Sequence, residues 1–226
     1  MRTLVVTAVP PERDAVLRAG DLLAAGDVLA AGVGPAAAAA ATATALTAAA
    51  WGGRPYGLVI SAGIGGGFSA EPPDPSDPPG VAVASAIIAA DLGAETSDGF
   101  TSVAELGFGT DTHRPPDRLA RAVAEVTGAA YGPILTVSTT TGSAERAAQL
   151  ARLHPGAVAE AMEGFGVAEA AAGHRLPVLE VRTISNPVGP RDRAAWRIPA
   201  ALAALTEAFR KMTPVVEGWK ERPWNP

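Results

Sequence analysis

The sequence predicts an α/β sandwich, in which helices cover a largely parallel or mixed β-sheet. Short β-rich apolar runs alternate with longer helix-favouring segments along the 226 residues. The clearest strand covers residues 178–184, where Val178, Val181 and Ile184 form an apolar run. A polar pair, Ser185 and Asn186, follows directly, and open α/β sheets bind their ligands at strand ends of this kind.

The remaining elements follow from the same patterns and from proline and glycine signals. Six further strands are expected at residues 4–8, 28–31, 58–63, 81–89, 134–137 and 157–161. Helices are expected at residues 12–23, up to about Trp51, at 116–128, from Ser143, at 162–173 and at 197–211. Residues 71–80 hold five prolines and predict a surface insertion, and residues 95–109 are expected to be irregular. No repeat or linker divides the chain, which predicts a single domain over residues 1–226.

Composition restricts the possible functions. The net charge of −5 argues against nucleic-acid binding, and no apolar run approaches the length of a membrane helix. The N-terminal apolar run is short and lacks a signal-peptide cleavage site, so the cytoplasm is the expected compartment. The absence of cysteine excludes disulfides and thiolate sites, and three scattered histidines predict no metal site.

Two glycine segments follow predicted strands, Gly32-Val33-Gly34 and Gly63-Ile64-Gly65-Gly66-Gly67. Such segments either form packing turns or let a ligand approach the backbone closely. The first lacks the third glycine of a dinucleotide fingerprint, the next strand ends in Ser61 instead of an acid, and neither segment holds a Walker lysine. We therefore expect no nucleotide cofactor, and no cofactor of another kind.

Two glutamates are candidates for chemistry. Glu12 follows the first strand, where it is either a solvated first-turn residue or a side chain presented to a ligand. Glu163 lies in an almost wholly apolar segment, where a carboxylate is costly without specific partners. Glu160 competes with it, and Met162 is either core or a ligand contact.

The segment after the last strand is also ambiguous. Asn186 before a proline is common in turns. Arg191, Arg193 and Arg197 surround Trp196, either as a solvated loop or as a clamp for a carboxylate or phosphate.

Taken in chain order, these motifs resemble the purine nucleoside phosphorylase/nucleosidase superfamily and its nucleosidase branch. The resemblance rests on Glu12, Gly32-Val33-Gly34, Ser61–Gly66, Ala161-Met162-Glu163 and Arg182–Ser185, and it covers residues 1 to about 210. Residues 98–109 and 185–198 are similar to the futalosine hydrolase family within that branch. The resemblance implies a three-layer sandwich around a mixed sheet, a homo-oligomer of two or more subunits, and a purine nucleoside as substrate.

The resemblance also implies residue roles in hydrolysis of an N-glycosidic bond, with release of hypoxanthine for menaquinone synthesis. Glu163 would bind the ribose hydroxyls, Glu12 would deprotonate the attacking water, and Asn186 would bond purine N7 and O6. Further substrate contacts are implied for Ser61, Ala62, Gly63, Met162 and Ser185. Arg193 or Arg197 would receive the carboxylate on the 5′ side of futalosine.

Two positions depart from the adenine-specific members of the branch. The adenine-specific members carry aspartate where this chain has Asn186. An amide can bond a 6-oxopurine without taking up a proton, so Asn186 predicts hypoxanthine over adenine as the base. The adenine-specific members also carry a phenylalanine shortly after the position of Ser138, where this chain has threonines. Either Phe100 or Phe165 replaces that ring, or backbone and threonine hold the base.

Two alternatives stay open. A phosphorylase on the same fold would need a phosphate nest near the first strand, where Glu12 would repel phosphate. A non-catalytic nucleoside-binding module would keep the glycine segments but would not require both Glu12 and Glu163.

Overall fold

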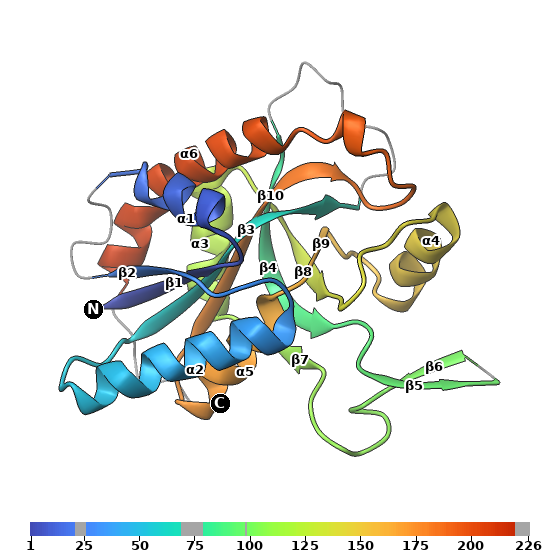
Figure 1. The fold of residues 1–226 in the computed structure, drawn as a ribbon, viewed down its shortest axis with the longest axis horizontal. Helices are drawn as coiled ribbons and strands as arrows, with labels where there is room; N and C mark the ends of the chain where they lie inside the picture. The colour runs from blue at the N-terminus through green and yellow to red at the C-terminus, as the bar shows by residue number, and fades with distance from the viewer. Residues whose placement is uncertain (21–25, 69–78, 98, 220–226) are drawn as a thin grey trace.

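The computed structural model describes residues 1–20, 26–68, 79–97 and 99–219 (Figure 1). Its central sheet has eight strands and mixes parallel with antiparallel pairs. The strands of this sheet are β1 (Thr3–Thr7), β2 (Asp27–Ala30), β3 (Leu58–Gly67), β4 (Val81–Ala89), β7 (Thr112–His113), β8 (Ala130–Thr136), β9 (Ala159–Ala161) and β10 (Val178–Pro187). The predicted α/β sandwich around a mixed sheet is confirmed.

Helices cover both faces of the sheet, which gives three layers (Figure 1). Helices α2 (Pro35–Trp51) and α5 (Gly164–Gly173) pack together on one face. The opposite face carries α1 (Pro10–Leu17), α3 (Asp117–Thr127) and α6 (Ile198–Gly218). Helix α4 (Ala144–Leu153) lies beside the sheet, and Ser143 caps it by accepting a hydrogen bond from the Arg146 amide over 3.2 Å.

The sheet closes on itself beside the three strands that matter for the site. The path β10-β4-β8-β9-β3 returns to β10, because β3 pairs with both β9 and β10. At the carboxyl end of β3, Gly66 is paired with Glu160 on one side and with Asn186 on the other. Closure therefore brings three chain segments, far apart in sequence, to one end of the sheet.

The glycine segment after residue 63 is strand and not loop, which corrects the prediction. Strand β3 continues through Gly67 because this stretch is hydrogen-bonded to neighbours on both sides. Its glycines are needed for space: a Cβ on Gly65 would lie 2.8 Å from the carbonyl oxygen of Glu160. Strand β10 likewise runs to Pro187 through a bulge between Ile184 and Asn186.

Other predicted boundaries also need correction. Helix α1 begins at Pro10 and ends at Leu17, whereas α6 continues to Gly218 because Met212 and Val216 extend its buried face. Part of the segment expected to be irregular forms a hairpin, β5 (Gly93–Thr96) and β6 (Gly99–Ser102), that leaves the sheet (Figure 1). Most of the proline-rich segment 71–80 lies outside the described residues.

The described residues include no helix that is both long and apolar enough to cross a membrane.

Candidate active site

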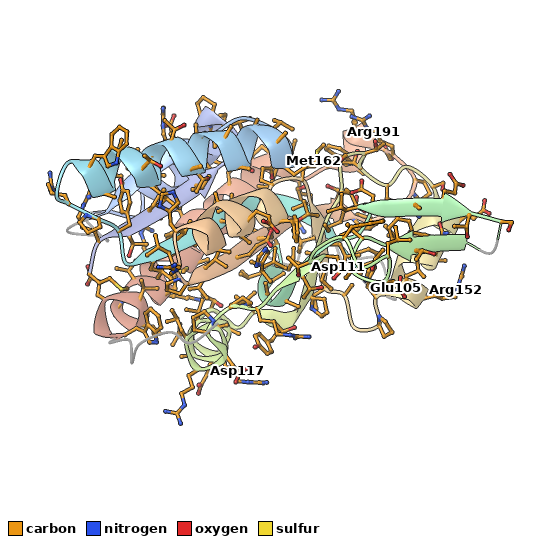
Figure 2. The ribbon with its side chains drawn as sticks, turned by 90° about the horizontal axis from the view of Figure 1, so that it is seen from below. Glu105, Asp111, Asp117, Arg152, Met162 and Arg191 are labelled. Atoms are coloured by element: carbon orange, nitrogen blue, oxygen red, sulfur yellow. The ribbon has the colours of Figure 1, made fainter. Side chains whose placement is uncertain are left out.

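A cavity of about 480 Å³ opens at the end of the sheet where β3, β9 and β10 meet. Six of the predicted site residues line it: Glu12, Met162, Glu163, Ser185, Asn186 and Arg193. Figure 2 shows Met162 and Arg191, another lining residue, near each other on the side of the molecule away from Asp117 on α3. The cavity thus collects side chains from β9, β10, the first turn of α1 and the segment before α6.

Glu12 is held by three backbone amides. Its Oε2 accepts hydrogen bonds from Ala8 N at 2.9 Å and Val9 N at 3.3 Å, and its Oε1 accepts one from Ile64 N at 2.9 Å. The contact with Val9 is the backward reach of a first-turn glutamate to the residue that begins the helix. Glu12 is only 3% exposed, so the solvated alternative is wrong. Its carboxylate has a fixed position at the cavity wall.

Glu163 is fixed from two sides. Its Oε1 accepts a hydrogen bond from Gly34 N at 3.1 Å, and its Oε2 lies 3.3 Å from the Arg182 guanidinium. Gly34 has a φ of +92°, a backbone conformation that glycine adopts without strain. The first glycine segment therefore supports a carboxylate of the protein itself.

Arg182 is the centre of a buried charge cluster, defined here as Glu12, Glu163, Glu180 and Arg182. The Arg182 Nε donates to Glu180 Oε1 at 2.9 Å, and its Nη2 donates to Ser61 Oγ at 3.0 Å. Both Arg182 and Glu12 approach Gly63 so closely that a Cβ there would lie 2.8 Å and 2.5 Å from their side-chain atoms. Gly63 thus provides room for the cluster.

Three carboxylates share one guanidinium in this cluster, and burial makes their ionisation costly. Desolvation raises the pKa of Glu12 above its ordinary value, although Arg182 opposes the shift. Desolvation also raises the pKa of Glu180, to about 7, and its Oε2 has no hydrogen-bond partner. With every member ionised the cluster carries an excess of negative charge, which would stabilise a cation formed in the cavity.

Asn186 presents an amide to the same cavity. Its Oδ1 accepts a hydrogen bond from Ser185 Oγ over 2.8 Å, and its Nδ2 donates to Pro187 O over 2.9 Å. The second Nδ2 hydrogen and the second lone pair of Oδ1 can serve a ligand. Asn186 can therefore act as donor and acceptor at the same time.

Glu160, the competitor of Glu163, lines the same cavity. Its carboxylate accepts hydrogen bonds from Thr141 N at 2.8 Å and from Thr141 Oγ1 at 2.5 Å. The threonine run after β8 therefore positions a carboxylate at the cavity wall.

Several predicted contacts lie elsewhere. Ser61 and Ala62 are fully buried in β3, Gly63 lies beneath the charge cluster, and none of them lines the cavity. Arg197 does not line it either; its amide donates to Ser185 O over 2.8 Å and so fixes the segment before α6.

The two phenylalanines considered as replacements for the missing ring are also away from the cavity. Phe165 packs against the His113 ring at a centroid distance of 5.2 Å, and Phe100 belongs to the β5–β6 hairpin. Trp196 is the one aromatic residue among the described residues that line the cavity.

Glu180 was missed by the sequence analysis, and Arg182 was noted without a role. A usable signal exists: charges at alternate positions of an apolar strand lie on one face of the sheet, and burial then requires them to pair.

Comparison with known proteins identifies the family. The phosphorylase superfamily model matches residues 9–217. A curated futalosine hydrolase of Streptomyces coelicolor is 63% identical, over 97% of this chain and 98% of its own length. The chain belongs to the phosphorylase superfamily and to its futalosine hydrolase family. A second relative in this family, the futalosine hydrolase of Acidothermus cellulolyticus, is 44% identical over 69% of this chain and 64% of its own.

Solved structures of nucleosidases share the fold. A 5′-methylthioadenosine/S-adenosylhomocysteine nucleosidase from S. pneumoniae superposes with a TM-score of 0.78 at 15% identity, covering 96% of this chain and 100% of its own. The corresponding enzyme from Colwellia psychrerythraea, solved with adenine, gives 0.76 at 21% identity, with 95% of each chain covered. These matches extend the shared fold over nearly the whole chain.

Proposed function

We propose that this member of the futalosine hydrolase family cleaves the N-glycosidic bond of futalosine and releases hypoxanthine. The observation that carries the proposal is the pair of buried carboxylates, Glu12 and Glu163, which line the same cavity as Asn186. The curated relative from Streptomyces coelicolor, named futalosine hydrolase, supports the choice of substrate.

The chemistry of N-glycosidic cleavage matches these positions. As the bond from C1′ to the purine breaks, the electron pair leaves with the base and the sugar becomes a cation. Glu163 binds the ribose hydroxyls and, with the rest of the buried charge cluster, stabilises that cation. Asn186 donates from Nδ2 to the departing purine, at O6 or N7, as electron density moves into the ring.

Glu12 completes the reaction by activating water. The water oxygen forms a bond to C1′, and its proton passes to the Glu12 carboxylate. Burial raises the pKa of Glu12, which makes its carboxylate a stronger base than that of an exposed glutamate. Met162, directly after β9, and Ser185 of β10 contact the substrate, and Ser61, Ala62 and Gly63 support the site from beneath.

Arg193 binds the carboxylate on the 5′ side of futalosine in this proposal. Its side chain lines the cavity beside Trp196, whereas Arg197 does not line it. A guanidinium recognises a carboxylate with two parallel hydrogen bonds.

A phosphorylase or an adenine-type nucleosidase on the same fold fits the site less well. Phosphate would have to approach the fixed carboxylate of Glu12, which would repel it. Hydrolysis predicts that hypoxanthine release is independent of phosphate. A non-catalytic nucleoside-binding module would have no use for two costly buried carboxylates.

The deciding experiment incubates the purified protein with futalosine and with inosine, each with and without phosphate, and assays hypoxanthine. We expect release from futalosine at the same rate in both buffers, with dehypoxanthine futalosine as the second product. A phosphate requirement would identify a phosphorylase, and equally efficient cleavage of 5′-methylthioadenosine would contradict the choice of base.

We also propose a cytoplasmic homo-oligomer that acts in menaquinone synthesis through a single domain and without a cofactor. Support for association comes from exposed apolar side chains near the β5–β6 hairpin: Leu92, Leu106 and Phe108.

A further inference from the structure

One row of the sheet carries polar side chains on both sides of a glycine. Gly66 of β3 pairs with Glu160 of β9 and with Asn186 of β10. Neighbouring strands lie about 4.8 Å apart, so the Cα atoms of Glu160 and Asn186 are separated by about 10 Å. Both side chains line the cavity. The two polar groups thus face one space from opposite sides.

Gly66 keeps the space between them open. A Cβ at this position would lie 3.4 Å from Asn186 Nδ2 and 2.9 Å from Val188 Cγ2. A larger residue would therefore fill the gap in front of the Asn186 amide. The row provides room for a flat ring whose edge meets an amide on one side and a carboxylate on the other.

The Glu160 carboxylate has unused acceptor capacity. A carboxylate has about four lone-pair sites, and the hydrogen bonds described above, both from Thr141, occupy two of them. Glu160 is 6% exposed, and no salt bridge joins it to a cation within the described part of the chain. A buried carboxylate with only neutral partners gains from each further donor that a ligand supplies.

We infer that Glu160 is a specificity-determining residue that accepts the N1–H of a 6-oxopurine while Asn186 binds the O6 and N7 edge. The inference rests on the proposed function and deepens it. A 6-oxopurine carries a hydrogen on N1, whereas N1 of a 6-aminopurine is an acceptor whose lone pair would face the carboxylate. The wrong base therefore places its N1 lone pair against the carboxylate, where an acceptor meets an acceptor, and a hydrogen-bonding site rejects such a ligand strongly.

The experiment compares Glu160→Gln with the wild type on futalosine and its 6-amino counterpart, which differ only in the purine. Glutamine keeps the shape and can still bond Thr141, but it loses the charge. We expect kcat/KM for futalosine to fall about 100-fold and that for the amino compound to change less than about threefold. Glu125→Gln, an exposed residue on α3, is the control for loss of one negative charge. Thermal unfolding verifies that both variants fold.

Two outcomes would overturn the inference. Equal losses for both substrates would mean that Glu160 only supports the threonine segment. A Thr141→Val variant removes a donor to Glu160 but keeps the carboxylate. Its ratio of kcat/KM for futalosine to kcat/KM for the amino compound should stay within about threefold of the wild-type ratio. If this ratio changes as much as in Glu160→Gln, Glu160 again only supports the threonine segment.

Binding measurements separate this inference from the proposed function. If the wild type releases no hypoxanthine from futalosine, the proposed function fails before any variant is made. Calorimetric titration with free hypoxanthine and free adenine then tests Glu160 without turnover. We expect Glu160→Gln to weaken hypoxanthine binding at least tenfold and to leave adenine binding unchanged or stronger. Unchanged hypoxanthine affinity would overturn the inference.

Discussion

The two ends of the cavity differ in how their charges are held. At one end, the members of the buried charge cluster are at most a few per cent exposed, and backbone amides or each other fix their side chains. At the other end, Arg191 and Arg193 are exposed and stack loosely on Trp196, with guanidinium carbons 5.6 Å and 5.9 Å from the ring centre. Protein groups hold the charges of the first end in place, whereas the charges of the second end are solvated.

This difference separates chemistry from binding. A charge held in place within a low-dielectric region acts on the transition state without reorganising, so its loss is expected to lower kcat. A solvated guanidinium must give up water to meet a ligand, and exposed ion pairs contribute only about 0.2–1 kcal/mol. Residues of the two ends should thus differ both in the size of their effects and in the kinetic constant that changes.

The largest effect is expected for Glu12→Gln. The amide keeps the size of the side chain but cannot take a proton from water, so kcat for futalosine should fall by about 10³-fold, within the usual range for a general base. KM should change little, because the ribose and purine contacts stay in place. Steady-state kinetics of hypoxanthine release measure both constants.

The pH dependence provides the control for this prediction. A base must be ionised to accept a proton, so the wild-type kcat should fall as pH drops through the pKa of Glu12, which burial raises above its ordinary value. The residual activity of Glu12→Gln should lack this acidic limb. A variant that keeps most of its activity, or keeps the limb, would remove Glu12 from the chemistry and weaken the contrast between the two ends.

A smaller effect is expected where the cluster packs against α5. A Cβ on Gly164 would lie 2.2 Å from Glu180 Oε2, so Gly164→Ala forces a buried carboxylate to move. We expect a loss of about 1–3 kcal/mol in the free energy of unfolding. Glu180 also holds Arg182, so kcat should fall as well. Denaturant unfolding and futalosine kinetics measure the two effects.

The same helix offers a matched control. A Cβ on Gly173 meets no atom within 4 Å, so Gly173→Ala should stabilise the protein by about 0.5–1 kcal/mol through helix propensity alone. If Gly164→Ala lowers the free energy of unfolding and Gly173→Ala raises it, the cluster is tightly packed. If Gly164→Ala is as stable as the wild type, the cluster can relax, and its rigidity is not what distinguishes it from the arginine end.

The sequence predicted the sandwich and most of its elements because apolar periodicity is a local property. It also indicated Glu12, Glu163 and Asn186 as candidates, since each lies where a strand or apolar segment meets a polar position. Strand closure could not be predicted in this way. The pairing of Gly66 with both Glu160 and Asn186 joins residues that are far apart in the chain, and no local pattern encodes it.

The partners of buried charges were equally hidden. In the sequence, Glu180 and Arg182 are only charged positions within an apolar strand. The fold shows that the Arg182 guanidinium hydrogen-bonds to Glu163, Ser61 and Glu180. The glycines of β3 were misread as a loop for a related reason. Their value lies in the space that they leave for side chains of other strands, which is a property of the packed structure.

The smallest kinetic effect is expected for the exposed arginines, Arg191 and Arg193. It is the closest test of the difference between these arginines and the buried charge cluster. Arg193→Ala should raise KM for futalosine about threefold and leave kcat unchanged, since an exposed guanidinium contributes roughly 0.2–1 kcal/mol to binding a carboxylate. Inosine has the same base and ribose but no such carboxylate, so its KM should stay constant. Arg197→Ala is the matched control, because Arg197 does not line the cavity and should affect the two substrates alike. Equal effects of Arg193→Ala on futalosine and inosine would contradict carboxylate binding, and a fall in kcat of tenfold or more would mean that the arginine end also acts on the transition state.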